Sequence, residues 1–193
     1  GLRQVVDITG PTGWQRLRHL MAAPVTRAAA RIQGPLILAL GEAPADLRFF
    51  FEMLVRLAPD ITTVRALCRA CEVRPSTLMS RLSRAGLPSP KSHLASVRLL
   101  HAAHLLEAPG RSIADVAYRL EYSSPQSFGR HVRAMLGITS LEFRRRFPFP
   151  AALARFLELM VAPYGGVWPV FHPLETGGWD SGHCVAVQAP PPH

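Results

Sequence analysis

Cysteine is scarce in this sequence: Cys68, Cys71 and Cys184 are the only three among 193 residues. Three cysteines are too few for a disulfide framework, and nothing in their use requires an oxidising compartment. Cys68 and Cys71 have the C-x-x-C spacing of redox and zinc sites, but no second such pair exists. Both lie on an apolar stripe of helical period, so we expect them to be core residues.

Long hydrophobic runs are also missing, although 48% of the residues are apolar. A membrane-spanning helix needs about 20 consecutive apolar residues, and no segment approaches that length. Residues 21–45 resemble a signal peptide only weakly, because their apolar core, residues 35–40, is short and Glu42 follows it. We therefore predict a cytoplasmic protein with a packed core and without a membrane partner.

Motifs for catalysis and cofactor binding are missing as well. The sequence has no G-x-S-x-G nucleophile elbow and no glycine-rich phosphate loop after a strand. His101 and His104 are spaced i, i+3, and His93 lies on a similar face, which is a spacing that could bind a metal ion. We do not expect a cysteine or carboxylate to complete such a site. The prediction is no enzyme activity, no cofactor and no metal, since a catalytic function would need a further domain.

Acidic residues are few where basic residues are many. Residues 61–147 contain 14 Lys+Arg and 5 Asp+Glu, a net charge of +9, whereas the rest of the chain contains 8 of each. Lys91 is the single lysine, so nearly all of the positive charge is carried by arginine, which suits bidentate contacts to phosphate and guanine. An excess that is focused on one region indicates a nucleic-acid-binding surface rather than a diffusely basic protein.

Two segments within that basic region share one pattern, residues 63–85 and residues 112–136. Each begins with apolar residues at i, i+3, i+4 and i+7, which form one face of a helix. A short turn follows, and then Pro75 or Pro125 stands just inside a second amphipathic helix, where a missing N–H is harmless. A short helix, a tight turn and a second helix make the motif that places a helix in the DNA major groove.

A long helix is predicted between the two motifs, over residues 90–106. Ser89 is a suitable N-cap, and Pro109-Gly110 ends the helix. Seventeen residues span about 25 Å, so this helix could hold two recognition helices on successive major grooves about 34 Å apart. Two capping boxes, at Ser112 with Asp115 and at Thr139 with Glu142, predict the starts of later helices and explain these carboxylates without catalysis.

The segment from residue 61 to residue 147 resembles the DNA-binding domain of AraC/XylS-type transcription regulators. The resemblance is carried by GRSIADVA, YSSPQSFGRHV and LEFRRRF, which occur in the family's order and spacing. It implies a mainly α fold with two helix-turn-helix subdomains joined by a long central helix. It also implies double-stranded DNA as the partner, transcription regulation as the function, and contact with RNA polymerase.

The resemblance implies base contacts at matching positions of the two recognition helices. Gln suits adenine and Arg suits guanine, whereas Ser and Met are weaker readers of a base edge. The base-contacting residues are expected to be Ser76, Met79, Ser80, Gln126, Gly129 and Arg130. The expected phosphate contacts are Arg81, Arg84, Lys91, Arg111, Arg133, Arg144, Arg145 and Arg146.

The sequence departs from the family in both turns. Glu72 and Glu121 stand where the family usually has Gly, so we expect a positive φ on a residue that disfavours it. Arg74, a poor N-cap, precedes the first recognition helix. These departures keep an alternative open: a degenerate helix-turn-helix module that binds DNA without sequence preference or binds another protein.

The remaining residues are predicted to form an N-terminal segment over 1–60 and a C-terminal segment over 148–193. The chain begins with Gly, and the first segment is interpreted as a remnant of an upstream sensor or receiver-like domain. We expect a strand at 5–8, helices at 14–21, 26–32 and 46–57, and either a strand or a buried helix at 36–40. A helix is expected at 151–161, followed by an irregular, loose tail from Pro163.

Overall fold

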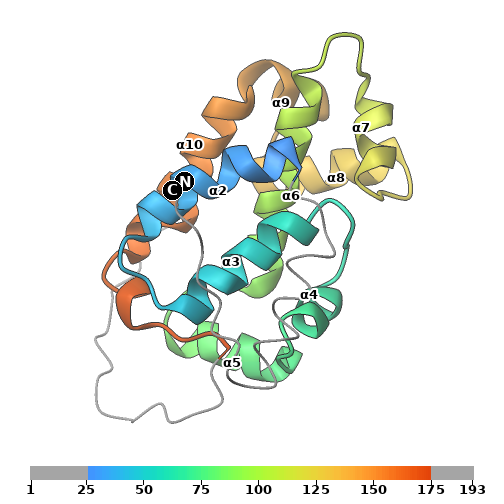
Figure 1. Cartoon of the computed structure of the whole chain (residues 1–193). Coiled ribbons are helices and arrows are strands. Elements are labelled where there is room, and N and C mark those ends of the chain that lie inside the picture. Colours follow the sequence, from blue (N-terminus) through green and yellow to red (C-terminus); the bar gives the residue numbers. More distant parts are fainter. Residues whose placement is uncertain (1–25, 175–193) are drawn as a thin grey trace.

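A computed structural model describes residues 26–174 (Figure 1), and that part contains nine α-helices and no strand. The predicted strand at 5–8 and helix at 14–21 lie outside the described residues. The helices are α2 (Arg27–Leu40), α3 (Ala45–Leu57), α4 (Val64–Ala70), α5 (Pro75–Arg84), α6 (Pro90–Leu106), α7 (Ile113–Arg119), α8 (Pro125–Leu136), α9 (Ser140–Arg146) and α10 (Phe149–Met160).

The two predicted helix-turn-helix units are confirmed. The pair α4 and α5 forms the first, and the pair α7 and α8 forms the second. Their apolar stripes are buried, including Cys68 at 1% and Cys71 at 6% exposure, so both cysteines are core residues. Burial also raises the pKa of the Cys68 thiol, which disfavours the reactive thiolate.

Helix α6 has the predicted bounds and runs through the middle of the molecule (Figure 1). The Ser89 side chain accepts a hydrogen bond from Ser92 N at 3.1 Å, as an N-cap should. Residues on every side of α6 are buried, because α2, α3 and α10 pack on it together with both helix-turn-helix units. Helices α4 and α5 lie near its start, whereas α7 and α9 lie near its end.

The two N-terminal helices cover one side of α6. The segment at 36–40 is helical and continues from the helix expected at 26–32, despite Gly34 and Pro35. Ile32, Leu36 and Leu40 are spaced by four residues and are all buried, so the packed face compensates for the hydrogen bond that proline removes. Helix α3 begins at Ala45, one residue before the prediction.

The C-terminal residues differ from the prediction. Helix α10 is Phe149–Met160 rather than 151–161, and the loose tail expected from Pro163 is wrong over residues 163–174. This stretch makes two 3-10 turns, and Trp168 and Phe171 are each only 1% exposed. Trp168 Nε1 donates to Val161 O at 2.8 Å, and its ring packs edge-on against Phe51 at 5.7 Å.

The same stretch is tied to α3 by hydrogen bonds. The Asp46 carboxylate is 3% exposed and accepts from Leu174 N at 3.1 Å and from His172 Nδ1 at 3.0 Å. Because buried carboxylates are stable only when paired, these contacts fix the segment in place. One hydrophobic core therefore extends from Ala29 to Leu174 and includes both helix-turn-helix units.

Candidate nucleic-acid interface

The first recognition helix, α5, exposes the residues expected to contact bases. Leu78 and Leu82 are buried, and Ser76, Met79 and Ser80 point away from the core as exposed residues. Met79 is 53% exposed, which is unusual for a large apolar side chain and is consistent with contact to a thymine methyl group. The helix therefore presents one polar, uncharged face with a single apolar side chain in it.

The second recognition helix, α8, presents a more specific set of groups. Gln126 and Arg130 are exposed, and Arg130 Nη2 donates to Ser127 Oγ at 2.9 Å. That hydrogen bond holds the guanidinium along the helix. Gly129 is half-buried, and a Cβ at that position would meet Ser140 Oγ of α9 at 4.0 Å. Gly129 therefore faces partly toward α9, whereas Gln126 and Arg130 face outward.

The starts of the two recognition helices differ. Ser124 caps α8, since its side chain accepts from Ser127 N at 3.1 Å. Arg74 makes no side-chain capping bond at α5, as its residue type predicted. The capping boxes at Ser112–Asp115 and Thr139–Glu142 are both present. Both helices of the second unit, and α9 after them, thus begin at a capping side chain.

Both turns contain a glutamate in the left-handed region, as predicted. The φ angle is 54° at Glu72 and 57° at Glu121, and these are the positive-φ non-glycine residues of the described part. In the first turn Val73 N bonds to Cys68 O at 3.0 Å and Glu72 N to Arg69 O at 3.2 Å. This is the Schellman motif, which usually has Gly at the left-handed position.

The second turn repeats the same geometry. Tyr122 N bonds to Ala117 O at 3.0 Å and Glu121 N bonds to Tyr118 O at 3.1 Å. The hydrogen bonds of the motif therefore hold each glutamate in a conformation that is strained for a residue with a Cβ. Both glutamate side chains are exposed.

The residues expected to contact phosphate fall into two groups. Most are exposed on the surface: Arg84, Lys91, Arg133, Arg144, Arg145 and Arg146. Arg81 and Arg111 are half-buried. Arg81 Nη1 donates to the carbonyl of Pro173 at 2.7 Å, and Arg144 Nη1 donates to the carbonyl of Arg111 at 3.0 Å. Arg81 is thus attached to the C-terminal segment, a contact that no sequence pattern indicated.

Arg98 was not among the residues predicted to be functional, and it is buried in the middle of α6 at 4% exposure. Its guanidinium donates to main-chain carbonyls that precede α4 and follow α7. The signal that the sequence offers is its place between Val97 and Leu99, because a charge that is buried among apolar residues needs hydrogen-bond partners. Its positive charge therefore does not contribute to the outer surface.

The histidines of α6 have separate partners. His101 Nε2 donates to Val55 O at 2.8 Å, and His93 Nδ1 donates to Ser89 O at 3.0 Å. Burial lowers the pKa of each to about 4, so both are neutral. His104 Nδ1 lies 3.7 Å from Glu107 Oε2. Residues 26–174 contain no group of three or more metal-binding side chains.

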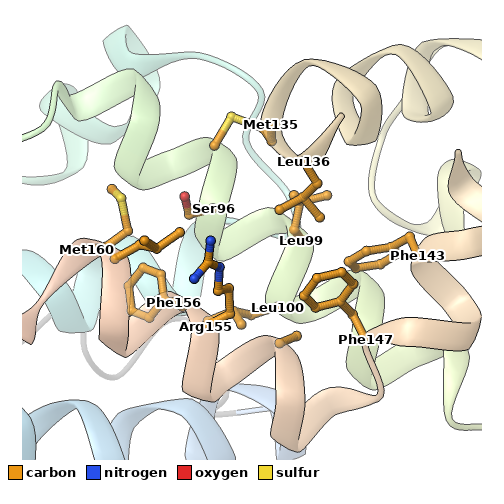
Figure 2. A pocket seen from close by; sticks show the side chains of 12 residues that line it. Ser96, Leu99, Leu100, Met135, Leu136, Phe143, Phe147, Arg155, Phe156 and Met160 are labelled. Atoms are coloured by element: carbon orange, nitrogen blue, oxygen red, sulfur yellow. The ribbon is translucent and has the colours of Figure 1, made fainter. Parts of the chain in front are cut away.

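A small apolar pocket lies behind the second unit, among α6, α8, α9 and α10 (Figure 2). Its volume is about 100 Å³, and its walls are mostly aromatic and aliphatic. Phe143 comes from α9 and Phe147 is the residue that caps its end, and Phe156 faces them from α10. Of the described residues that line it, Arg155 is the one that is charged, so the pocket belongs to the apolar packing behind α8 and α9.

Comparison with known protein families agrees with this geometry. Residues 67–146 match a family model described as "Helix-turn-helix domain", of the AraC type. Neither the search of curated proteins nor the search of solved structures found a match. In the part of the chain that the structure describes, no helix has the length and apolar character needed to cross a bilayer. Residues 67–146 therefore form a helix-turn-helix DNA-binding domain of the AraC/XylS type.

Proposed function

We propose that the protein recognises a specific DNA sequence by inserting α5 and α8 into successive major grooves on one face of the duplex. The observation that carries this proposal is the pair of helix-turn-helix units fixed on one helix, α6, each with an exposed polar face on its second helix. The major groove recurs about every 34 Å along one face of a duplex. The 17 residues of α6 span about 25 Å, so recognition helices packed near its two ends could reach successive grooves.

The residues would divide into two roles. Gln126 and Arg130 would contact adenine and guanine edges, and Ser76, Met79 and Ser80 would make weaker contacts in the other groove. Gly129 would allow the backbone of α8 to approach the DNA. The exposed arginines and Lys91 would contact phosphates and set the register. Because both recognition helices belong to one chain, the site would be asymmetric and a monomer would suffice.

The test begins with DNA selected from a random duplex library by the full chain. Fluorescence anisotropy should then show binding with a log K against log salt slope of about −5 to −9, as six to ten phosphate contacts require. The selected sequence should bind at least about a thousandfold more tightly than a scrambled duplex of equal length. A slope near zero would contradict DNA binding itself.

A second candidate is a general DNA binder or protein-interaction module. It is favoured by the exposed carboxylates of Glu72 and Glu121 and by the attachment of Arg81 to Pro173. A general DNA binder predicts the steep salt dependence but no enrichment of a sequence in the selection, whereas a protein-interaction module predicts neither. Contact with RNA polymerase is a further proposal that rests on the family resemblance, and a promoter-transcription assay with purified polymerase would test it.

A further inference from the structure

Arg98 is a buried cation whose partners are mainly main-chain carbonyls. Its Nη1 donates to Ala58 O at 2.8 Å and to Ile61 O at 2.5 Å. Its Nη2 donates to Leu120 O, and its guanidinium carbon lies 4.5 Å from the centre of the Tyr122 ring. The planar guanidinium has five N–H groups in a fixed fork, so the three carbonyls and the ring define its position together.

The first two carbonyls belong to the entry of the first helix-turn-helix unit. Ala58 is the C-cap of α3, and Ile61 lies two residues before Thr63, the N-cap of α4. Their hydrogen bonds to Arg98 therefore fix the point at which the chain leaves α3 and begins the first unit.

The other two partners belong to the turn of the second unit. Leu120 is the C-cap of α7 and precedes the strained Glu121. The hydroxyl of Tyr122 is hydrogen-bonded to His131 Nδ1 of α8, and the Tyr122 ring packs edge-on against Phe128 at 5.3 Å. Through Tyr122, Arg98 is thus connected to the second recognition helix itself.

We propose that Arg98 is the positioning residue that sets the placement of the two recognition helices relative to one another. One side chain on α6 holds the start of the first unit with one nitrogen and the turn of the second with the other. The inference rests on the proposed two-groove binding, because relative placement matters only if both helices contact DNA. A lysine at position 98 cannot take over this positioning role, since its ammonium group is a point charge and lacks the planar fork of N–H groups that reaches both units.

The experiment measures tolerance of half-site spacing. The probes are the duplex selected by the wild-type chain and a duplex with one base pair inserted between its half-sites. That insertion moves one half-site by about 3.4 Å and about 35°. The wild-type chain should bind the inserted duplex at least about tenfold more weakly, the loss expected for about one base contact. The quantity compared is the ratio of the Kd for the inserted duplex to the Kd for the selected duplex. In Arg98→Lys and Arg98→Met this ratio should fall to about threefold or less.

The ratio separates positioning from stability. A variant that only unfolds more easily loses active protein for both duplexes, and the ratio of their affinities stays constant. Arg56→Lys is the matched control: Arg56 is buried at 7% exposure, and its ion pair with Glu52 at 3.3 Å stays within α3. Its ratio should equal that of the wild type. Should Arg98→Met fail to fold, Arg98→Lys alone decides the outcome.

An unchanged ratio in Arg98→Lys, with tenfold discrimination in the wild type, would overturn the positioning role and leave the proposed function intact. Absence of any spacing preference in the wild type would instead refute two-groove binding, and the role of Arg98 would fall with it. A reduced ratio in Arg56→Lys would also count against the proposal, because it would show that general loosening of the core changes spacing tolerance.

Discussion

Replacing Glu121 with glycine should both stabilise the fold and tighten DNA binding. Glu121 has a φ of 57° at the left-handed position of a Schellman motif, where an L-residue costs about 1–2 kcal/mol. Glycine removes that strain but increases the entropy of the unfolded chain, which offsets about 0.4–1 kcal/mol. The net gain in the free energy of unfolding is therefore about 0.8 kcal/mol, within a range of about 0–1.6 kcal/mol, and the middle value corresponds to about 2–3 °C in Tm for a chain of this size.

The binding effect has a separate cause, and a second variant isolates it. Glu121→Gly removes an exposed carboxylate near the proposed DNA surface, and exposed charge pairs are worth about 0.2–1 kcal/mol, a factor of up to about five in Kd. Glu121→Ala removes the same charge but keeps the Cβ and its strain. We expect both variants to tighten binding equally at low salt and only Glu121→Gly to raise Tm.

The assays are thermal unfolding by circular dichroism and anisotropy titration at two salt concentrations. The gain in affinity should shrink at high salt, because screening weakens exposed charges. Equal Tm values for Glu121→Gly and Glu121→Ala would show that the turn is not strained. A gain in affinity that persists unchanged at high salt would show that repulsion of phosphate is not its cause.

Three further outcomes are expected. Arg130→Ala and Gln126→Ala should each cost about 1–3 kcal/mol on the best DNA site and relax preference at one base pair, whereas Ser80→Ala should cost less; competition binding with single-base variants measures this. Lowering the pH from 6.5 toward 4 should lower Tm, because His93, His101 and His131 have folded-state pKa values of about 4 through burial and their protonation favours the unfolded chain. His101→Gln should reduce that pH dependence. Gly129→Ala should raise Tm, because alanine favours the helix by up to about 1 kcal/mol and the added Cβ would meet Ser140 Oγ only at 4.0 Å. If this stable variant binds DNA more weakly than the wild type, α8 approaches the DNA closely at this position.

The predictions from sequence succeeded where local chemistry determines structure. Helix α6 has the predicted bounds because Ser89 caps its start and Pro109-Gly110 follows its end. The positive φ at Glu121 was predicted because the family has glycine in that turn. Exposure of Gln126 and Arg130 followed from the apolar stripe on the opposite side of α8. In each case the deciding residues lie within a few positions of the element that they determine.

The predictions failed where a distant contact determines structure. Residues 163–174 have no periodicity, and their order depends on Trp168 meeting Phe51 and on Asp46 accepting from Leu174 N. Pairs separated by more than a hundred residues leave no pattern in a single sequence. The same holds for Arg98, whose acceptors are carbonyls and therefore carry no residue-type signal.

Under the proposed function, the two units would contribute unequally to recognition. Helix α5 begins at Arg74, which makes no capping bond, and it exposes serines and Met79, while its Arg81 donates to Pro173 O in the C-terminal segment. Helix α8 begins at the capping Ser124 and offers an amide and a guanidinium, the groups that discriminate best between bases. Because α6 would hold the two recognition helices at a fixed separation, weak contacts of α5 in one groove would still position α8 for its stronger contacts in the next groove. We therefore expect the selected DNA site to show strong base preference in the half that contacts α8 and weak preference in the half that contacts α5. Equal base preference in the two halves would contradict this expectation. It would show that Ser76, Met79 and Ser80 distinguish bases as well as Gln126 and Arg130 do.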